Sequence, residues 1–228
     1  MQHLLLLHGA IGAKDQLQPL AEKLKDTFKV HTLSFSGHGG EAMPETFSIE
    51  AFAADVLTYL QKNNIGKASL FGYSMGGYVA LYLAKHHPAK VEKIFTLATK
   101  FLWTPEIAAK ETKMLDAEKI AGKIPAFANA LEQRHAPNDW KAVLQKTAAM
   151  MTELGHNNPL QLSDYEQIEQ PVLIGIGDKD TMVTLEETID VYRKLKNANF
   201  IVLPNTQHPI EKVDVERLAR EVELFFIE

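Results

Sequence analysis

A serine between two glycines is the residue of this sequence best suited to do chemistry. Ser74 lies in the segment Gly72-Tyr73-Ser74-Met75-Gly76, with an apolar run before it and a helical pattern after it. Small residues two positions before and after a serine suit a sharp strand-to-helix turn, which strains the serine backbone and exposes its hydroxyl. The first N–H groups of the following helix point to the same place. The segment therefore predicts a nucleophile with half of an anion-binding site beside it.

A serine nucleophile needs a base, and the base needs a group that orients it. His208 is the preferred base because it follows a predicted strand and a turn, near the edge of the sheet to which Ser74 points. Residues 177–180 close another predicted strand and offer two carboxylates, Asp178 and Asp180. A glycine three residues before the acid favours Asp180, which leaves Asp178 to solvent or to the turn.

The oxyanion that forms during acyl transfer needs two hydrogen-bond donors. The backbone N–H of Met75 is the first candidate. The second is expected from the glycine-rich loop after the first predicted strand, where Ala10 is the preferred donor and Ile11 the alternative. His8, at the end of that strand, is expected to tie loops together by hydrogen bonds of its ring.

Composition excludes several classes of protein. The 228 residues, 46% of them hydrophobic, suffice for one large domain with an inserted subdomain. A net charge of −5 with scattered Lys and Arg argues against a nucleic-acid surface, and the absence of Cys removes disulfides and thiolate metal sites. The apolar run Leu4 to Leu7 is shorter than the core of about 7–15 residues that a signal peptide needs. We expect a cytoplasmic monomer or homodimer that acts on a small acyl substrate, without membrane association, cofactor or metal.

Short β-rich runs alternate with helical patterns, which is typical of a parallel sheet with helices on both faces. The strands are predicted at 2–7, 28–34, 68–71, 93–97, 172–176 and 200–203, and the helices near 15–24, 49–63, 77–86, 185–195 and 215–226. The second strand is polar enough for an edge of the sheet, because Lys29, His31 and Thr32 lie in it.

One long stretch interrupts this alternation. Helical patterns without a strand signal occupy 104–115, 117–134 and 139–154. Because connections this long are usually functional, we predict a helical lid at 99–165, inserted into a core domain of residues 1–98 and 166–228.

The inner face of the predicted lid is expected to contact substrate. The candidates are Phe101, Trp103, Met114, Phe127, Trp140, Met150 and Met151. Of these, Trp103 and Met150 are taken together with Ile11 as substrate-binding residues. Arg134 and His135 could meet an acidic substrate, although a solvent-exposed face is the preferred interpretation.

At this point the chain resembles the α/β-hydrolase superfamily over nearly its whole length. The matching pieces, in order, are His8-Gly9, Gly37-His38-Gly39, Gly72-Tyr73-Ser74-Met75-Gly76-Gly77, Gly177-Asp178-Lys179-Asp180 and His208. The resemblance implies Ser74 as nucleophile, Asp180 as acid and His208 as base, with Ala10 and Met75 as oxyanion donors. It also implies a helical lid at the place of the long insertion.

Two features depart from that family pattern. Its members usually open with an antiparallel hairpin before the His-Gly strand, whereas this chain begins at that strand, so we predict a shortened sheet of about six parallel strands. Ser34 stands where many members carry an aspartate before the Gly-His-Gly turn. That difference weakens a loop anchor and does not affect the catalytic inference.

The leading hypothesis is a serine hydrolase that cleaves a small carboxylic ester or thioester through an acyl-enzyme on Ser74. The same groups serve amides, lactones or carbon–carbon cleavage, and neither fold nor triad chooses among these. A hypothesis from another class is a ligand-binding or signalling protein that keeps the triad and turns over one ligand slowly. A dinucleotide loop at Gly9–Gly12 or Gly37–Gly40 is disfavoured, because neither has the full glycine fingerprint.

Overall fold

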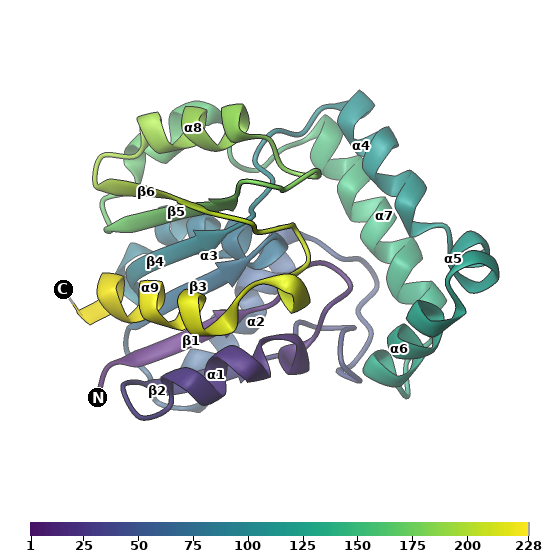
Figure 1. Ribbon diagram of the computed structural model, residues 1–228, viewed down its shortest axis with the longest axis horizontal. Helices are drawn as coiled ribbons and strands as arrows, with labels where there is room; N and C mark the ends of the chain where they lie inside the picture. Colours follow the sequence, from purple (N-terminus) through teal and green to yellow (C-terminus); the bar gives the residue numbers. More distant parts are fainter. Residues whose placement is uncertain (228) are drawn as a thin grey trace.

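Six parallel strands form the centre of the molecule (Figure 1). The computed structural model describes residues 1–227. The strands are β1 (His3–Leu7), β2 (Lys29–Leu33), β3 (Ala68–Tyr73), β4 (Val91–Leu97), β5 (Val172–Gly177) and β6 (Ala198–Leu203). Their order is β2-β1-β3-β4-β5-β6, and every neighbouring pair is parallel. The predicted fold class and the predicted edge position of β2 are confirmed.

Helices cover both faces of this sheet. They are α1 (Gln18–Leu24), α2 (Ile49–Lys62), α3 (Met75–His86), α8 (Leu185–Lys194) and α9 (Val215–Ile227). In Figure 1, α1 and α9 lie in front of the sheet, whereas α2 and α3 lie behind it. Short 3-10 turns occur at η1 (Lys14–Leu17), η2 (Pro88–Lys90), η3 (Thr112–Leu115), η4 (Leu162–Gln167) and η5 (Ile210–Lys212).

The leucine run of β1 shows how the sequence builds these layers. Successive side chains of a strand point to opposite faces, and all four leucines are fully buried because both faces are covered. Leu5 and Leu7 pack in the core cluster that includes α2, α3 and α8. Leu4 and Leu6 pack in the cluster that includes α1 and α9. An unbroken apolar run is therefore required here in place of an alternating pattern.

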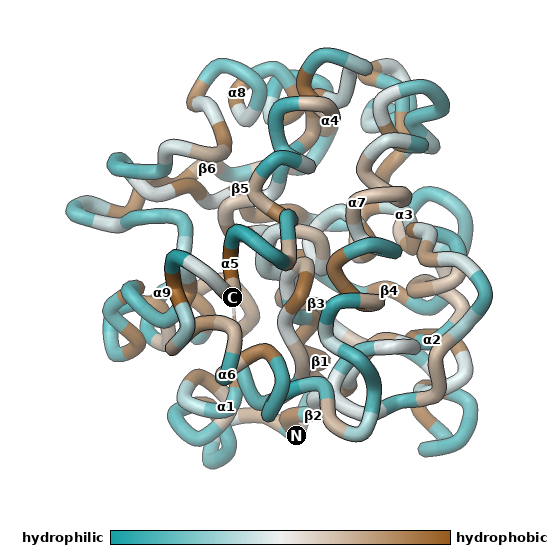
Figure 2. The backbone as a smooth tube through the Cα atoms, turned by 90° about the vertical axis from the view of Figure 1, so that its right-hand side faces the viewer, coloured by the Kyte–Doolittle hydropathy of each residue, from teal (hydrophilic) through white to brown (hydrophobic). Residues whose placement is uncertain are grey.

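The segment between β4 and β5 is helical, as the sequence predicts. Its helices are α4 (Pro105–Glu111), α5 (Ala117–Lys123), α6 (Pro125–His135) and α7 (Trp140–His156). They lie beyond the ends of the strands, at the right of Figure 1. Figure 2 looks onto these helices and shows hydrophilic and hydrophobic residues alternating along them.

The helical pattern over 117–134 forms two helices, α5 and α6. The structure divides it, because Ile124 leaves the helical conformation (φ −138°, ψ 63°) and Pro125 starts the next helix. A proline has no N–H to continue a helix and disfavours helical backbone in the residue before it.

None of the helices within residues 1–227 combines the length and hydropathy that a membrane-spanning helix requires.

Candidate active site

The turn at Ser74 joins β3 to α3 and has the strained backbone expected from its sequence. Ser74 has φ 51° and ψ −116°, so it lies at positive φ, where residues other than glycine are uncommon. A Cβ added to Gly72 would lie 2.4 Å from Gly77, and one added to Gly76 would lie 2.3 Å from the carbonyl oxygen of Leu7. The flanking glycines are needed because the turn packs directly on neighbouring backbone.

Strand register brings three predicted residues to one edge of the sheet. Tyr73 pairs with Leu97, Leu97 with Gly175 and Gly177 with Leu203, so β3 and β4 end together and β5 and β6 extend two residues further at the same edge. Ser74 follows β3 directly, Asp180 lies three residues after the end of β5, and His208 lies five residues after the end of β6. Sites in open α/β sheets form at this edge.

Ser74, His208 and Asp180 form a chain of polar contacts. The Oγ of Ser74 lies 3.4 Å from Nε2 of His208, and the Nδ1–H of His208 donates to Oδ2 of Asp180 at 2.8 Å. Because Nδ1 carries the proton, Nε2 faces the serine as an acceptor. The serine–histidine distance is long for a hydrogen bond, as is common before substrate binds. The arrangement can remove a proton from the hydroxyl.

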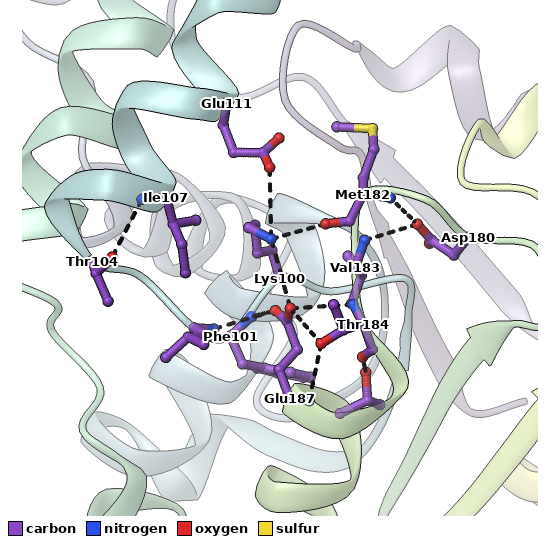
Figure 3. Close-up of polar contacts among 12 residues, drawn as sticks. Lys100, Phe101, Thr104, Ile107, Glu111, Asp180, Met182, Val183, Thr184 and Glu187 are labelled. Atoms are coloured by element: carbon purple, nitrogen blue, oxygen red, sulfur yellow. Dashed lines mark hydrogen bonds and ion pairs between the residues drawn. The ribbon is translucent and has the colours of Figure 1, made fainter.

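Asp180, and not Asp178, lies beside the histidine. The Asp180 side chain is 1% exposed, and its Oδ1 accepts the N–H groups of Met182 at 2.8 Å and Val183 at 2.9 Å (Figure 3). Although burial alone would raise the pKa of Asp180, its hydrogen bond and charge interaction with His208, together with these N–H groups, lower the pKa below the ordinary value. Asp178 is exposed, and its carboxylate accepts the N–H of Thr206 at 3.0 Å.

Tyr73 holds the histidine loop in place. Its hydroxyl donates to the carbonyl oxygen of His208 at 3.0 Å. Burial raises the pKa of Tyr73, so the hydroxyl stays a donor. Because Tyr73 precedes Ser74 in the chain, one peptide segment positions both the serine and the histidine.

The loop after β1 approaches the same site. Ala10 and Met75 line one cavity with Ser74 and His208. Met75 is the first residue of α3, where backbone N–H groups have no partner within the helix. A Cβ on Gly9 would lie 2.7 Å from the Tyr73 ring, which accounts for a glycine there.

His8 connects that loop to the end of β2. Its Nδ1–H donates to the carbonyl oxygen of Gly9 at 2.7 Å, and its Nε2 accepts the N–H of Phe35 at 3.0 Å. Burial lowers the pKa of His8 to about 3, so the ring is neutral and Nε2 can accept. Ser34 makes a lesser anchor nearby, since its hydroxyl accepts the N–H of Lys14 at 3.1 Å.

Ile11 lies outside the lining of the cavity. It has φ 54°, and its side chain packs against a cluster from α5, α6 and α7 that includes Leu131 and Trp140. Its carbonyl oxygen accepts the Nε2–H of His135 at 3.1 Å, while Nδ1 of His135 accepts the N–H of Gly39 at 3.2 Å. His135 is fully buried, so the expected solvent-exposed face is wrong for this residue. Periodicity could not show this, because the partners are far away in sequence.

The cavity beside Ser74 has about 500 Å³ of empty space, including its mouth. Trp103, Met150 and Met151 line it, as the sequence suggests. Other predicted lid candidates lie elsewhere: Met114 and Phe127 are exposed, and Phe101 and Trp140 pack in core clusters. The lining residues that sequence reasoning missed are Ile49, Tyr78, Lys100, Glu111, Leu154, Met182 and Val183.

Some of the missed residues had a signal. Leu154 is one helical turn from Met150 on α7, and Lys100 follows β4 at the edge where the site forms. Tyr78 follows Ser74 by one helical turn on α3, whereas Glu111 had no signal, because only the packing of helices brings it to the cavity. Within residues 1–227, no group of three or more His, Asp or Glu side chains is arranged to hold a metal ion.

Comparison with known proteins agrees with this architecture. A family model described as the alpha/beta hydrolase fold matches residues 2–150. A pimeloyl-[acyl-carrier protein] methyl ester esterase of Neisseria meningitidis serogroup C is 28% identical over 223 residues, which cover 89% of this chain and 85% of that protein. The 2-(acetamidomethylene)succinate hydrolase of Mesorhizobium japonicum is 24% identical over 243 residues, covering 97% and 87%.

A solved structure extends the match to the whole fold. The thermophilic esterase from Thermogutta terrifontis aligns with a TM-score of 0.80 at 20% identity, covering 100% of this chain and 90% of that one. The family-model match, the parallel sheet and the strained serine turn lead to one conclusion: the chain belongs to the α/β-hydrolase fold family.

Proposed function

We propose that the protein is a serine hydrolase that cleaves a small carboxylic ester or thioester through an acyl-enzyme on Ser74. The observation that carries this proposal is the contact chain from Ser74 through His208 to Asp180, beside a largely apolar cavity. Relatives named as esterases support the ester chemistry expected from the sequence.

His208 acts as the base in this reaction. Its Nε2 takes the proton of the Ser74 hydroxyl as the oxygen attacks the carbonyl carbon, and Asp180 stabilises the imidazolium that forms. The backbone N–H groups of Ala10 and Met75 bind the oxyanion, each contributing about 3–4 kcal/mol to the transition state. The imidazolium then protonates the departing alcohol or thiol. Water, deprotonated by His208, hydrolyses the acyl-enzyme and regenerates the serine.

We also propose that residues 99–165 act as a lid over the core formed by residues 1–98 and 166–228. In support, Glu111 from α4 and Met150, Met151 and Leu154 from α7 line the same cavity as the serine. Their largely apolar side chains suit a small acyl group. A cytoplasmic location and a monomeric or homodimeric state stay predictions from the sequence.

Labelling with a fluorophosphonate and steady-state hydrolysis of p-nitrophenyl acetate and butyrate test the proposal. We expect both to disappear in Ser74→Ala and to persist in Ser163→Ala, a matched change at an exposed serine. Labelling that survives in Ser74→Ala would refute the assignment. One rapid acylation without further turnover would favour the slow-turnover ligand-binding alternative. Labelling without ester turnover, followed by cleavage of amide or diketone substrates, would favour the other bond types.

A further inference from the structure

Three charged side chains meet beside the cavity (Figure 3). Lys100 follows β4, Glu111 ends α4, and Glu187 lies in the first turn of α8. The Nζ of Lys100 is 3.8 Å from Glu111 and 3.6 Å from Glu187, and it donates to the carbonyl oxygen of Met182 at 2.9 Å. The side chains are 14%, 6% and 4% exposed, respectively. Their formal charges sum to −1, in a place with little access to water.

Glu187 has its hydrogen bonds supplied by the protein. Its Oε1 accepts the N–H groups of Phe101 at 2.9 Å and Leu102 at 3.3 Å. Its Oε2 accepts the N–H of Thr184 at 3.2 Å and the hydroxyl of the same residue at 3.1 Å. This carboxylate closes a capping box at the start of α8 and holds the chain after β4. Glu187 is thus fully engaged in supporting the fold.

Glu111 differs from Glu187. Among residues 1–227, no group donates a hydrogen bond to its carboxylate, and the nearest cation is the shared Lys100. Leaving a buried carboxylate without donors is costly, so natural proteins usually satisfy such groups. The indole N–H of Trp103, which lines the same cavity, is also buried without a partner in the described chain. The cavity therefore presents a carboxylate whose partner in the described chain is the shared Lys100, and an indole N–H that has no partner there.

We propose that Glu111 determines specificity by binding an ammonium group at the end of the substrate's acyl chain remote from the ester. This inference rests on the proposed esterase function. A cation is favoured because it neutralises the excess charge and can donate hydrogen bonds to the Glu111 carboxylate, whose contact with Lys100 is too long for a hydrogen bond. An anionic group would meet two carboxylates, and Lys100 is already engaged by Met182, Glu111 and Glu187.

The shared lining of the cavity guides the choice of probe. Ser74 and Glu111 both line this space, so an ester that reacts at Ser74 can present its remote end to Glu111. The space of about 500 Å³ includes the open mouth, and it therefore sets only an upper bound on the size of the substrate. Methyl 6-aminohexanoate, a small linear ester with a terminal ammonium, is a suitable probe.

The test compares three methyl esters by their release of methanol. Methyl 6-aminohexanoate carries the ammonium, methyl heptanoate has a methyl group in its place, and monomethyl heptanedioate ends in a carboxylate. We expect the wild-type protein to have the highest kcat/KM for the ammonium ester. In Glu111→Gln, the ratio of kcat/KM for the ammonium ester to that for methyl heptanoate should fall about 10- to 100-fold. Glu132→Gln, which removes the same charge from an exposed lid position, should leave the ratio unchanged.

Several results would overturn this inference. Hydrolysis of methyl heptanoate that depends on Ser74, without preference for the ammonium ester, would reject the role of Glu111 and leave the proposed function intact. A preference for monomethyl heptanedioate would assign recognition to Lys100 instead. An unchanged ratio in Glu111→Gln, with all three rates lowered together, would make Glu111 a structural residue. The wild-type comparison does not depend on whether a variant folds.

A binding measurement covers the case in which none of these esters is hydrolysed. Calorimetry would then measure the binding of methyl 6-aminohexanoate to Ser74→Ala and to the double variant with Glu111→Gln. Binding that weakens at least about 10-fold in the double variant would support the inference without turnover. Absence of binding to Ser74→Ala, or equal binding to both proteins, would reject it.

Discussion

Replacing Asp180 by asparagine tests most directly whether this carboxylate orients His208, the proposed base. The side chain keeps its shape, and its amide oxygen can still accept the N–H groups of Met182 and Val183. In that orientation the amide nitrogen of the asparagine faces Nδ1 of His208, which in the wild-type protein lies 2.8 Å from a carboxylate oxygen of Asp180. Two donors cannot share this contact, so the imidazole moves its proton to Nε2. The nitrogen that faces Ser74 then carries a hydrogen and cannot act as a base.

The expected loss follows from that wrong tautomer. Asparagine at this position in an unrelated triad lowers kcat about 10⁴-fold, which corresponds to about 5.4 kcal/mol in the activation free energy. We expect a decrease of the same order in the kcat for p-nitrophenyl butyrate. Far-ultraviolet circular dichroism and a thermal melt would show that the variant is folded.

Asp178→Asn is the matched control for this prediction. It makes the same chemical change two residues away, and asparagine can still accept the N–H of Thr206. We expect its kcat to stay within about threefold of the wild-type value, since surface changes of this kind are small. Equal losses in the two variants, or a loss below about tenfold for Asp180→Asn, would show that Asp180 does not set the tautomer.

Two further predictions concern stability. Gly76→Ala puts a methyl group 2.3 Å from the carbonyl oxygen of Leu7 and should lower the free energy of unfolding by about 1–3 kcal/mol. The control Gly122→Ala, whose methyl group meets nothing within 4 Å, should not lower it. Equal midpoints of urea unfolding for the two variants would contradict this prediction. Burial lowers the pKa of His8 to about 3 in the folded protein, from an ordinary value of 6.5. Below about pH 6.5 the unfolded chain therefore binds more protons than the folded one, and the free energy of unfolding decreases as the pH is lowered. Between pH 7 and pH 5 this should cost about 2 kcal/mol in urea unfolding, and His8→Gln should lack that part of the loss; an identical pH dependence in the variant would refute the assignment.

The core of this fold is readable from sequence because its determinants are local. The glycines around Ser74 fix a turn within five residues, and the spacing of Asp180 after a strand distinguishes it from Asp178. The apolar runs also mark the strands without reference to distant partners. These features predict the six-stranded parallel sheet, and they place Ser74, Asp180 and His208 at the same edge of it.

The helical segment between β4 and β5 shows where local reasoning ends. The break at Pro125 follows a local rule that the periodicity of the surrounding residues concealed. The burial of His135 and the contact of Lys100 with Glu187 depend on segments about 90 or more residues apart. Such contacts are decided by tertiary packing, so the polar end of the cavity could not be predicted from spacing.

The imidazole of His135 joins the helices between β4 and β5 to the loop after β1. From the end of α6 it donates to the carbonyl oxygen of Ile11, next to Ala10, and its other nitrogen accepts the N–H of Gly39. A helical segment transplanted from another hydrolase would have to supply an equivalent side chain, because the loop that carries Ala10 would otherwise lose these hydrogen bonds. Because this loop carries the proposed oxyanion donor Ala10, exchanging the helices to change the substrate range should also change the rate.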